Sequence, residues 1–209
     1  MQLESNDLRE GAPIDERFAF GKPDPDEHMA LADNISPHLN WSGAPAGTRS
    51  FVIVCMDPDV PASADDVNQE GKTLPADMER VDFCHWAMVD VAPEVTELAT
   101  GACSDGVTLK GKQDPPGPAG ARQGLNDYTN FLAGAEDMAG NYYGYDGPCP
   151  PWNDERVHHY EFTVYALDID RLEVSGDFTG HDVVEALKGH VLDQASLTGT
   201  YTLNPALRD

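Results

Sequence analysis

Four stretches of the chain have the hydrophobic pattern of β-strands. They cover residues 50–56, 85–91, 158–167 and 197–203. The first is an unbroken apolar, β-branched run, which predicts a strand buried on both faces. The third alternates, so that His158 and Tyr160 face one way while Glu161 and Thr163 face the other. We expect the first strand to end at Asp57, because the two prolines that follow cannot donate to a strand ladder.

One helix is predicted towards the C-terminal end. Thr179 can cap it, and Asp182 and Glu185 lie near its positive N-terminal end. Its apolar stripe consists of Val183, Val184, Leu187, Val191 and Ala195. Because strands outnumber helices, we expect a mainly β fold, an antiparallel sheet structure with a few peripheral helices.

Polar, Gly- and Pro-rich stretches separate the predicted strands. Residues 62–80 and 101–145 are expected to form long surface loops with a functional role. The N-terminal end is polar and is expected to be an arm or an edge strand. We divide the chain into an arm over residues 1–17, a single domain over 18–204 and a tail over 205–209.

Acidic side chains dominate the composition. The 209 residues include 37 acidic and 13 basic side chains, for a net charge of −24. This charge disfavours nucleic acid and anionic membranes as partners. It suits either a highly soluble surface or adaptation to high salt, which screens self-repulsion. Without a visible secretory signal or an apolar run of membrane-spanning length, the cytoplasm is the expected compartment.

The four cysteines are widely spaced. They are Cys55, Cys84, Cys103 and Cys149. The absence of a Cys-x-x-Cys pair counts against zinc-ribbon and thioredoxin-like sites, and buried free thiols are expected. The sequence suggests no cofactor.

Ionisable groups stand at the ends of the strongest strands. Asp57 and Asp59 follow the first strand, His85 begins the second, and His158 and Tyr160 begin the third. Buried polar groups are costly unless they are partnered, so we expect these side chains to meet at one end of a sheet. Individually, Asp57 could instead cap a turn, His158 could be a core histidine and Tyr160 could fill the strand.

A Pro-rich segment over residues 147–151 directly precedes the third strand. Gly147 would let a ligand approach the backbone amides closely. Together with the two imidazoles and the phenol, these amides would suit an anion such as phosphate. The carboxylates would orient the imidazoles and raise their pKa, which predicts a positively charged socket.

An enzymatic alternative uses the same groups. Asp57, His85 and His158 could act as acid–base groups of a hydrolase or as ligands of a metal that activates water. The chain has neither a Gly-x-Ser-x-Gly motif nor a His-x-x-x-His pair on a helix. Cys84 adjoins His85, but neighbours on a strand point to opposite faces.

Four further histidines lack a comparable context and are interpreted as structural or surface residues. They are His28, His38, His181 and His190.

The order of the motifs resembles that of a known family. The segments are residues 57–61, 85–86, 147–151 and 158–167, with further similarity over 36–48, 188–192 and 197–201. Together they resemble the phosphatidylethanolamine-binding protein family, in particular its bacterial and archaeal Raf-kinase-inhibitor-like branch. One departure follows the Pro-Pro pair, where Trp152-Asn153-Asp154 replaces a glycine-containing turn.

The resemblance implies an antiparallel β-sandwich with a small anion-binding pocket. By motif, this pocket falls on Asp57, Asp59, His85, Gly147, His158 and Tyr160. Members of the family act as lipid-headgroup binders, kinase-pathway or protease inhibitors, or scaffolds. We therefore expect a non-catalytic protein that binds a small anion or phosphorylated ligand and could dock a kinase or protease through its long loops. An exposed strand could also support a homodimer.

Overall fold

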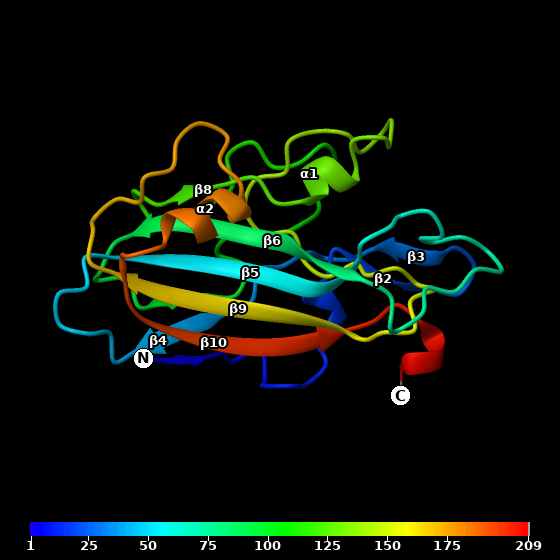
Figure 1. Cartoon of the computed structure of the whole chain (residues 1–209), viewed down its shortest axis with the longest axis horizontal. Helices are drawn as coiled ribbons and strands as arrows, with labels where there is room; N and C mark the ends of the chain where they lie inside the picture. Colours follow the sequence, from blue (N-terminus) through cyan, green and yellow to red (C-terminus); the bar gives the residue numbers. More distant parts are fainter. Residues whose placement is uncertain (209) are drawn as a thin grey trace.

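The computed structural model describes residues 1–208, and its largest element is a five-stranded antiparallel sheet (Figure 1). The strands are β1 (Gln2–Glu4), β2 (Gly21–Asp24), β3 (His28–Leu31), β4 (Leu39–Ser42), β5 (Ser50–Pro61), β6 (Arg80–Val91), β7 (Glu97–Leu98), β8 (Arg122–Gln123), β9 (His158–Leu167) and β10 (Val191–Tyr201). The helices are α1 (Tyr128–Phe131), α2 (Gly180–Ala186) and the 3-10 turns η1 (Glu16–Phe18) and η2 (Pro205–Leu207).

The main sheet has the strand order β10-β9-β5-β6-β8, and both of its faces are covered. A smaller sheet, β1-β4-β7, packs on one face, where the rings of Trp41 and Phe51 lie 5.5 Å apart. Helix α2 packs on the other face, where Val183 contacts the cluster around Val52 and Val54. The predicted mainly β, antiparallel sandwich is confirmed, and the two-sided burial of the first strand is confirmed for residues 50–55, whereas Met56 is half-buried.

Strand β5 is longer than the sequence predicts. It runs to Pro61, whereas we expected it to end at Asp57. Its pairing with β9 stops at Met56, and beyond that point only β6 pairs with it, with a register shift between Asp57 and Val60. Prolines are tolerated where a strand is bulged and unpaired on one side, so the predicted end is wrong.

Helix α2 is shorter than its apolar stripe predicts. It begins as expected, with a capping box between Thr179 and Asp182, but it ends at Ala186. Gly189 then adopts φ +86°, and the chain turns into β10. Val191 and Ala195 therefore belong to a strand, and the prediction that they extend the helical stripe is wrong.

The N-terminal residues form part of the sandwich. β1 pairs with β4 at the edge of the smaller sheet, so the edge-strand alternative holds for Gln2–Glu4. Leu3, Leu8 and Ile14 lie in the core. At the other end of the chain, η2 lies in the expected tail, of which residue 209 is outside the described residues.

Residues outside the predicted site also behave largely as expected. The cysteines are free, three of them buried and Cys149 half-buried. The four histidines interpreted as structural or surface residues each pair with a carboxylate: His28 with Glu70, His38 with Glu97, His181 with Asp127 and His190 with Asp168. Over residues 1–208 the structure contains no helix of the length and apolarity that crossing a bilayer requires.

Candidate functional site

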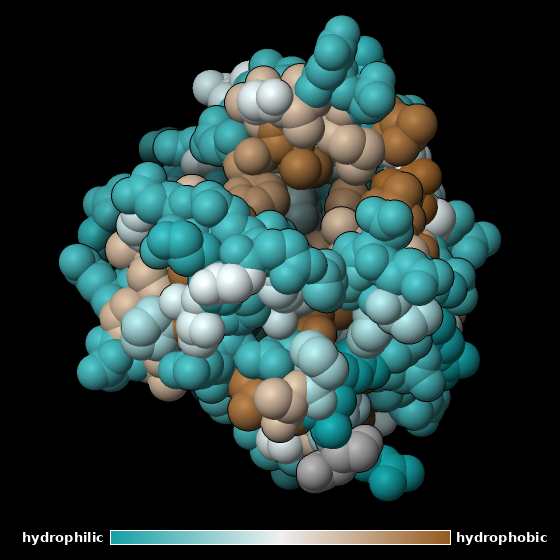
Figure 2. All heavy atoms as spheres, turned by 90° about the vertical axis from the view of Figure 1, so that its right-hand side faces the viewer, coloured by the Kyte–Doolittle hydropathy of each residue, from teal (hydrophilic) through white to brown (hydrophobic). Residues whose placement is uncertain are grey.

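A small cavity of about 90 Å³ opens where β5 ends and β6 and β9 begin. Its floor carries four of the predicted site residues: Asp57, His85, His158 and Tyr160. The walls are mainly apolar and come from the segment after β5, from α1 and from the Pro-rich segment. Figure 2 shows a hollow bordered by apolar side chains on this face of the molecule. Four of the five residues that the sequence placed at strand ends therefore line one cavity, and Asp59 does not.

One wall of the cavity belongs to the long loop between β5 and β6. Asn153 fixes this loop: its side-chain amide donates to the carbonyls of Asp66 and Lys72, and its Oδ1 accepts from the Asn68 N–H. Nearby, the His28 ring stacks on Trp152 at 4.0 Å. These contacts hold the loop against the Pro-rich segment, so the cavity wall is built from two segments far apart in sequence.

His158 lies between two buried carboxylates. Its Nδ1 is 2.7 Å from Asp57 Oδ2, and its Nε2 is 3.1 Å from Asp154 Oδ2. Burial alone would lower the pKa of His158, but the hydrogen bonds to Asp154 and Asp57 and their charges raise it to about 9. The ring is therefore an imidazolium at neutral pH, as predicted, but neither N–H is left for a ligand.

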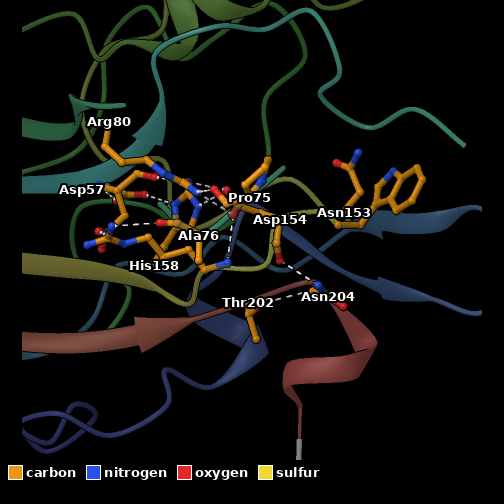
Figure 3. A network of polar contacts seen from close by, with 12 residues as sticks. Asp57, Pro75, Ala76, Arg80, Asn153, Asp154, His158, Thr202 and Asn204 are labelled. Carbon is orange, nitrogen blue, oxygen red and sulfur yellow. Dashed lines mark hydrogen bonds and ion pairs between the residues drawn. The ribbon is translucent and has the colours of Figure 1, made fainter. Parts of the chain in front are cut away.

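Asp154 joins this pair to Arg80, as Figure 3 shows. The Arg80 guanidinium donates to both Asp154 oxygens, at 2.6 and 3.0 Å. Burial favours the neutral form of Asp154, but hydrogen bonds from His158 and Arg80 outweigh it and lower its pKa. The Asn204 side chain donates to the main-chain carbonyl of Asp154 and so ties the C-terminal segment to the network.

His85 has a different environment. Its Nδ1 is 2.9 Å from the main-chain carbonyl of Asp146, and since a carbonyl only accepts, Nδ1 carries the proton. Burial lowers the pKa of His85, and the Asp57 charge offsets this only partly. The ring is therefore neutral, with an Nε2 lone pair. The prediction that carboxylates raise the pKa of both imidazoles is wrong for His85.

A buried polar cluster holds the carbonyl that orients His85. The Asp146 carboxylate accepts from Lys112 Nζ at 2.6 Å and from Asn34 and Asn126 at 2.8 Å each. Burial raises the pKa of Asp146, while Lys112 and the amides counteract part of that rise. The cluster fixes the backbone at residue 146, and thereby the tautomer of His85.

Tyr160 contributes a buried, unpaired hydroxyl to the residues that line the cavity. Its side chain is fully buried, and its hydroxyl has no hydrogen-bond partner among the described residues. Its ring packs edge-on against His85, with centroids 5.1 Å apart. An unpaired buried hydroxyl costs about 1–3 kcal/mol, which a ligand oxygen could recover.

The other two predicted residues lie outside the cavity lining. Asp59 is buried beside it, where it pairs with Arg156 and accepts from the main-chain and ring N–H groups of His159. The Gly147 N–H donates to Asn34 Oδ1 at 2.8 Å, so this amide does not face the cavity. The expectation that it is open to a ligand is wrong: Gly147 is small because its backbone packs against the Phe18 carbonyl.

Sequence reasoning missed several residues that shape the site. Asp154 lies just after the Pro-Pro pair, in the segment that departs from the family pattern. Its position four residues before His158 was the signal that could have placed it near the histidine. Asp146, Lys112 and Tyr128 gave no signal, because they lie in the irregular 101–145 stretch or its border. Over residues 1–208 no group of three or more His, Cys, Asp or Glu side chains has an arrangement that could hold a metal ion.

Comparisons with known proteins place this chain in a family. The family model described as phosphatidylethanolamine-binding protein matches residues 4–202. The chain therefore belongs to the phosphatidylethanolamine-binding protein family, as the resemblance of its motifs indicated.

Individual relatives agree with this assignment. The chain is 33% identical over 202 residues to the UPF0098 protein YbhB of Escherichia coli, covering 97% of this chain and all of that protein. It is 32% identical to a UPF0098 protein of Methanothermobacter thermautotrophicus, covering 85% of this chain and 89% of the relative. The crystal structure of E. coli YbcL, described as a new member of the mammalian PEBP family, superposes with a TM-score of 0.70 at 27% identity, over 96% of this chain and 97% of that one.

Proposed function

We propose that this protein is a non-catalytic binding protein whose cavity takes a small anionic group, such as phosphate or a phosphorylated or carboxylated ligand. The observation that carries the proposal is the hydroxyl of Tyr160, a residue that lines the cavity: it is buried and has no hydrogen-bond partner among the described residues. A ligand oxygen would accept this hydrogen bond. His85 Nε2, once protonated, would supply a second, charged donor.

The rest of the cavity suggests what else the ligand carries. Its lining includes the apolar side chains of Val67, Phe83 and Phe131, and Phe131 is 50% exposed. The volume of about 90 Å³ suits a small group rather than a drug-sized molecule. A ligand with an anionic end and an apolar substituent at the rim fits this combination.

The same geometry favours binding over hydrolysis. A general base must have a free lone pair, but both ring nitrogens of His158 are bonded to carboxylates and protonated. The oxygens of Asp57 are occupied by His158 and by the Asp59 N–H. Two of the three groups assigned acid–base roles in the hydrolase alternative, Asp57 and His158, are thus bonded to each other, which leaves His85 as the one member with a free lone pair.

Titration with inorganic phosphate, followed by NMR of the histidine ring resonances, tests the proposal. We expect a saturable shift of the His85 signals. Tyr160→Phe should weaken binding about tenfold or more, because it removes a hydrogen bond to a charged acceptor. Tyr143→Phe is the matched control, since that hydroxyl pairs with Asp177 outside the cavity. His85 signals that stay unchanged throughout the titration would contradict the proposal.

A further inference from the structure

A charge-balanced cluster forms the side of the cavity that holds His158. The Asp57 and Asp154 carboxylates bond to the His158 ring, and the Arg80 guanidinium bonds to Asp154. All four side chains are at least 93% buried, given side-chain exposures of 1%, 1%, 0% and 7%. Two negative and two positive charges therefore cancel in a region with little access to water.

Asp154 is the member that completes this balance. It bonds to Nε2 of the His158 ring, whereas Asp57 bonds to Nδ1 (Figure 3), and it does not itself line the cavity. Without its carboxylate, His158 would bond to Asp57 alone, Nε2 would be free, and Arg80 would lose its acidic partner. The cluster would then be net positive.

This balance limits how much negative charge a ligand can bring. The other basic group on the cavity floor is His85, which can take up one proton. The remaining charges nearby pair with each other, as Asp59 does with Arg156. One proton on His85 neutralises a monoanion, whereas a dianion would leave one buried negative charge unpaired, and unpaired buried charges are strongly disfavoured.

We propose that Asp154 is a specificity-determining residue that makes the cavity select singly charged over doubly charged anions. This inference rests on the proposed function, because it concerns the same cavity. It deepens that function by naming the ligand class: a phosphodiester or carboxylate monoanion rather than a phosphomonoester dianion.

A matched pair of ligands tests the selectivity. Methyl phenyl phosphate carries one charge, whereas phenyl phosphate is mainly a dianion at pH 7.5, because the second pKa of a phosphomonoester is about 6. Calorimetric titration of the wild-type protein should give at least roughly tenfold tighter binding of the diester. In Asp154→Asn, the ratio of the two affinities should move at least roughly tenfold towards the dianion.

Two further variants serve as controls. Asp170→Asn removes the same charge from an exposed residue near the Leu167 end of β9 and should leave the ratio unchanged. If Asp154→Asn does not fold, Arg80→Gln tests the same claim by removing a positive charge. This variant should weaken the binding of the dianion more than the binding of the monoanion.

The outcomes separate the two proposals. If neither ligand binds the wild-type protein, the proposed function fails and the inference with it. If both bind and neither Asp154→Asn nor Arg80→Gln changes their ratio by more than about twofold, the inference is overturned while the proposed function stands.

Discussion

His85 and His158 carry the same side chain but differ in charge because their partners differ. His158 bonds to two carboxylates, which raise its pKa to about 9, whereas His85 bonds to a main-chain carbonyl and burial lowers its pKa. Both histidines stand at the ends of predicted strands, and from this position we expected both rings to reach one site, which they do. Their position could not predict their charges, because the deciding partners, Asp154 and Asp146, come from loops.

The charge of His158 makes stability depend on pH. Its pKa is about 9 in the folded chain against an unfolded value of roughly 6.5, so its stabilising contribution is complete below pH 6.5 and is lost as the pH rises towards 9. We expect the free energy of unfolding to fall by about 3 kcal/mol over this range. Urea denaturation at several pH values measures it.

His158→Gln is the comparison for this prediction. The buried thiols also ionise at high pH, but they are present in both proteins. Their effect therefore cancels in the difference between the two free energies of unfolding. If the free energy of unfolding changes with pH in the same way in the wild-type protein and the variant, His158 is not the charged centre of the cluster.

At the scale of elements, hydrophobic patterns predicted where β5 and β9 lie but not all of the boundaries. The Asp-Pro segment after Met56 can continue as a strand because it pairs with β6 alone, so its prolines need not donate to a second neighbour. This one-sided pairing belongs to the tertiary structure and cannot be predicted from composition. The start of α2 was predictable from its Thr179 cap. Its end was predicted wrongly, because the spacing of Val191 and Ala195 fits a helical stripe although both residues belong to β10.

The Pro-rich segment makes a testable contribution to packing. A Cβ at Gly147 would collide with the Phe18 carbonyl, so Gly147→Ala should destabilise the fold by about 2 kcal/mol through overpacking. Gly134→Ala is the matched control, because a Cβ there meets no atom within 4 Å. Thermal denaturation of both variants checks this, and equal melting temperatures would refute the packing role.

At the scale of the whole molecule, the net charge of −24 opposes the approach of any anion. The sequence predicted a positively charged socket within this acidic chain. In the structure, the charges of the cluster around His158 instead cancel, and His85 is neutral. Anion binding therefore requires a proton, and the affinity should rise as the pH falls, by up to about tenfold per unit while His85 is neutral in the free protein and charged in the complex.

Proton uptake on binding is the most direct measurement of this claim. Methyl phenyl phosphate does not titrate near neutral pH, so calorimetry in two buffers of different ionisation enthalpy reports only protons bound by the protein. At pH 7 we predict uptake of close to one proton for each ligand bound by the wild-type chain, and none for any residual binding by His85→Ala. Binding to the wild-type protein without proton uptake would contradict the claim that a protonated His85 binds the anion in this cavity.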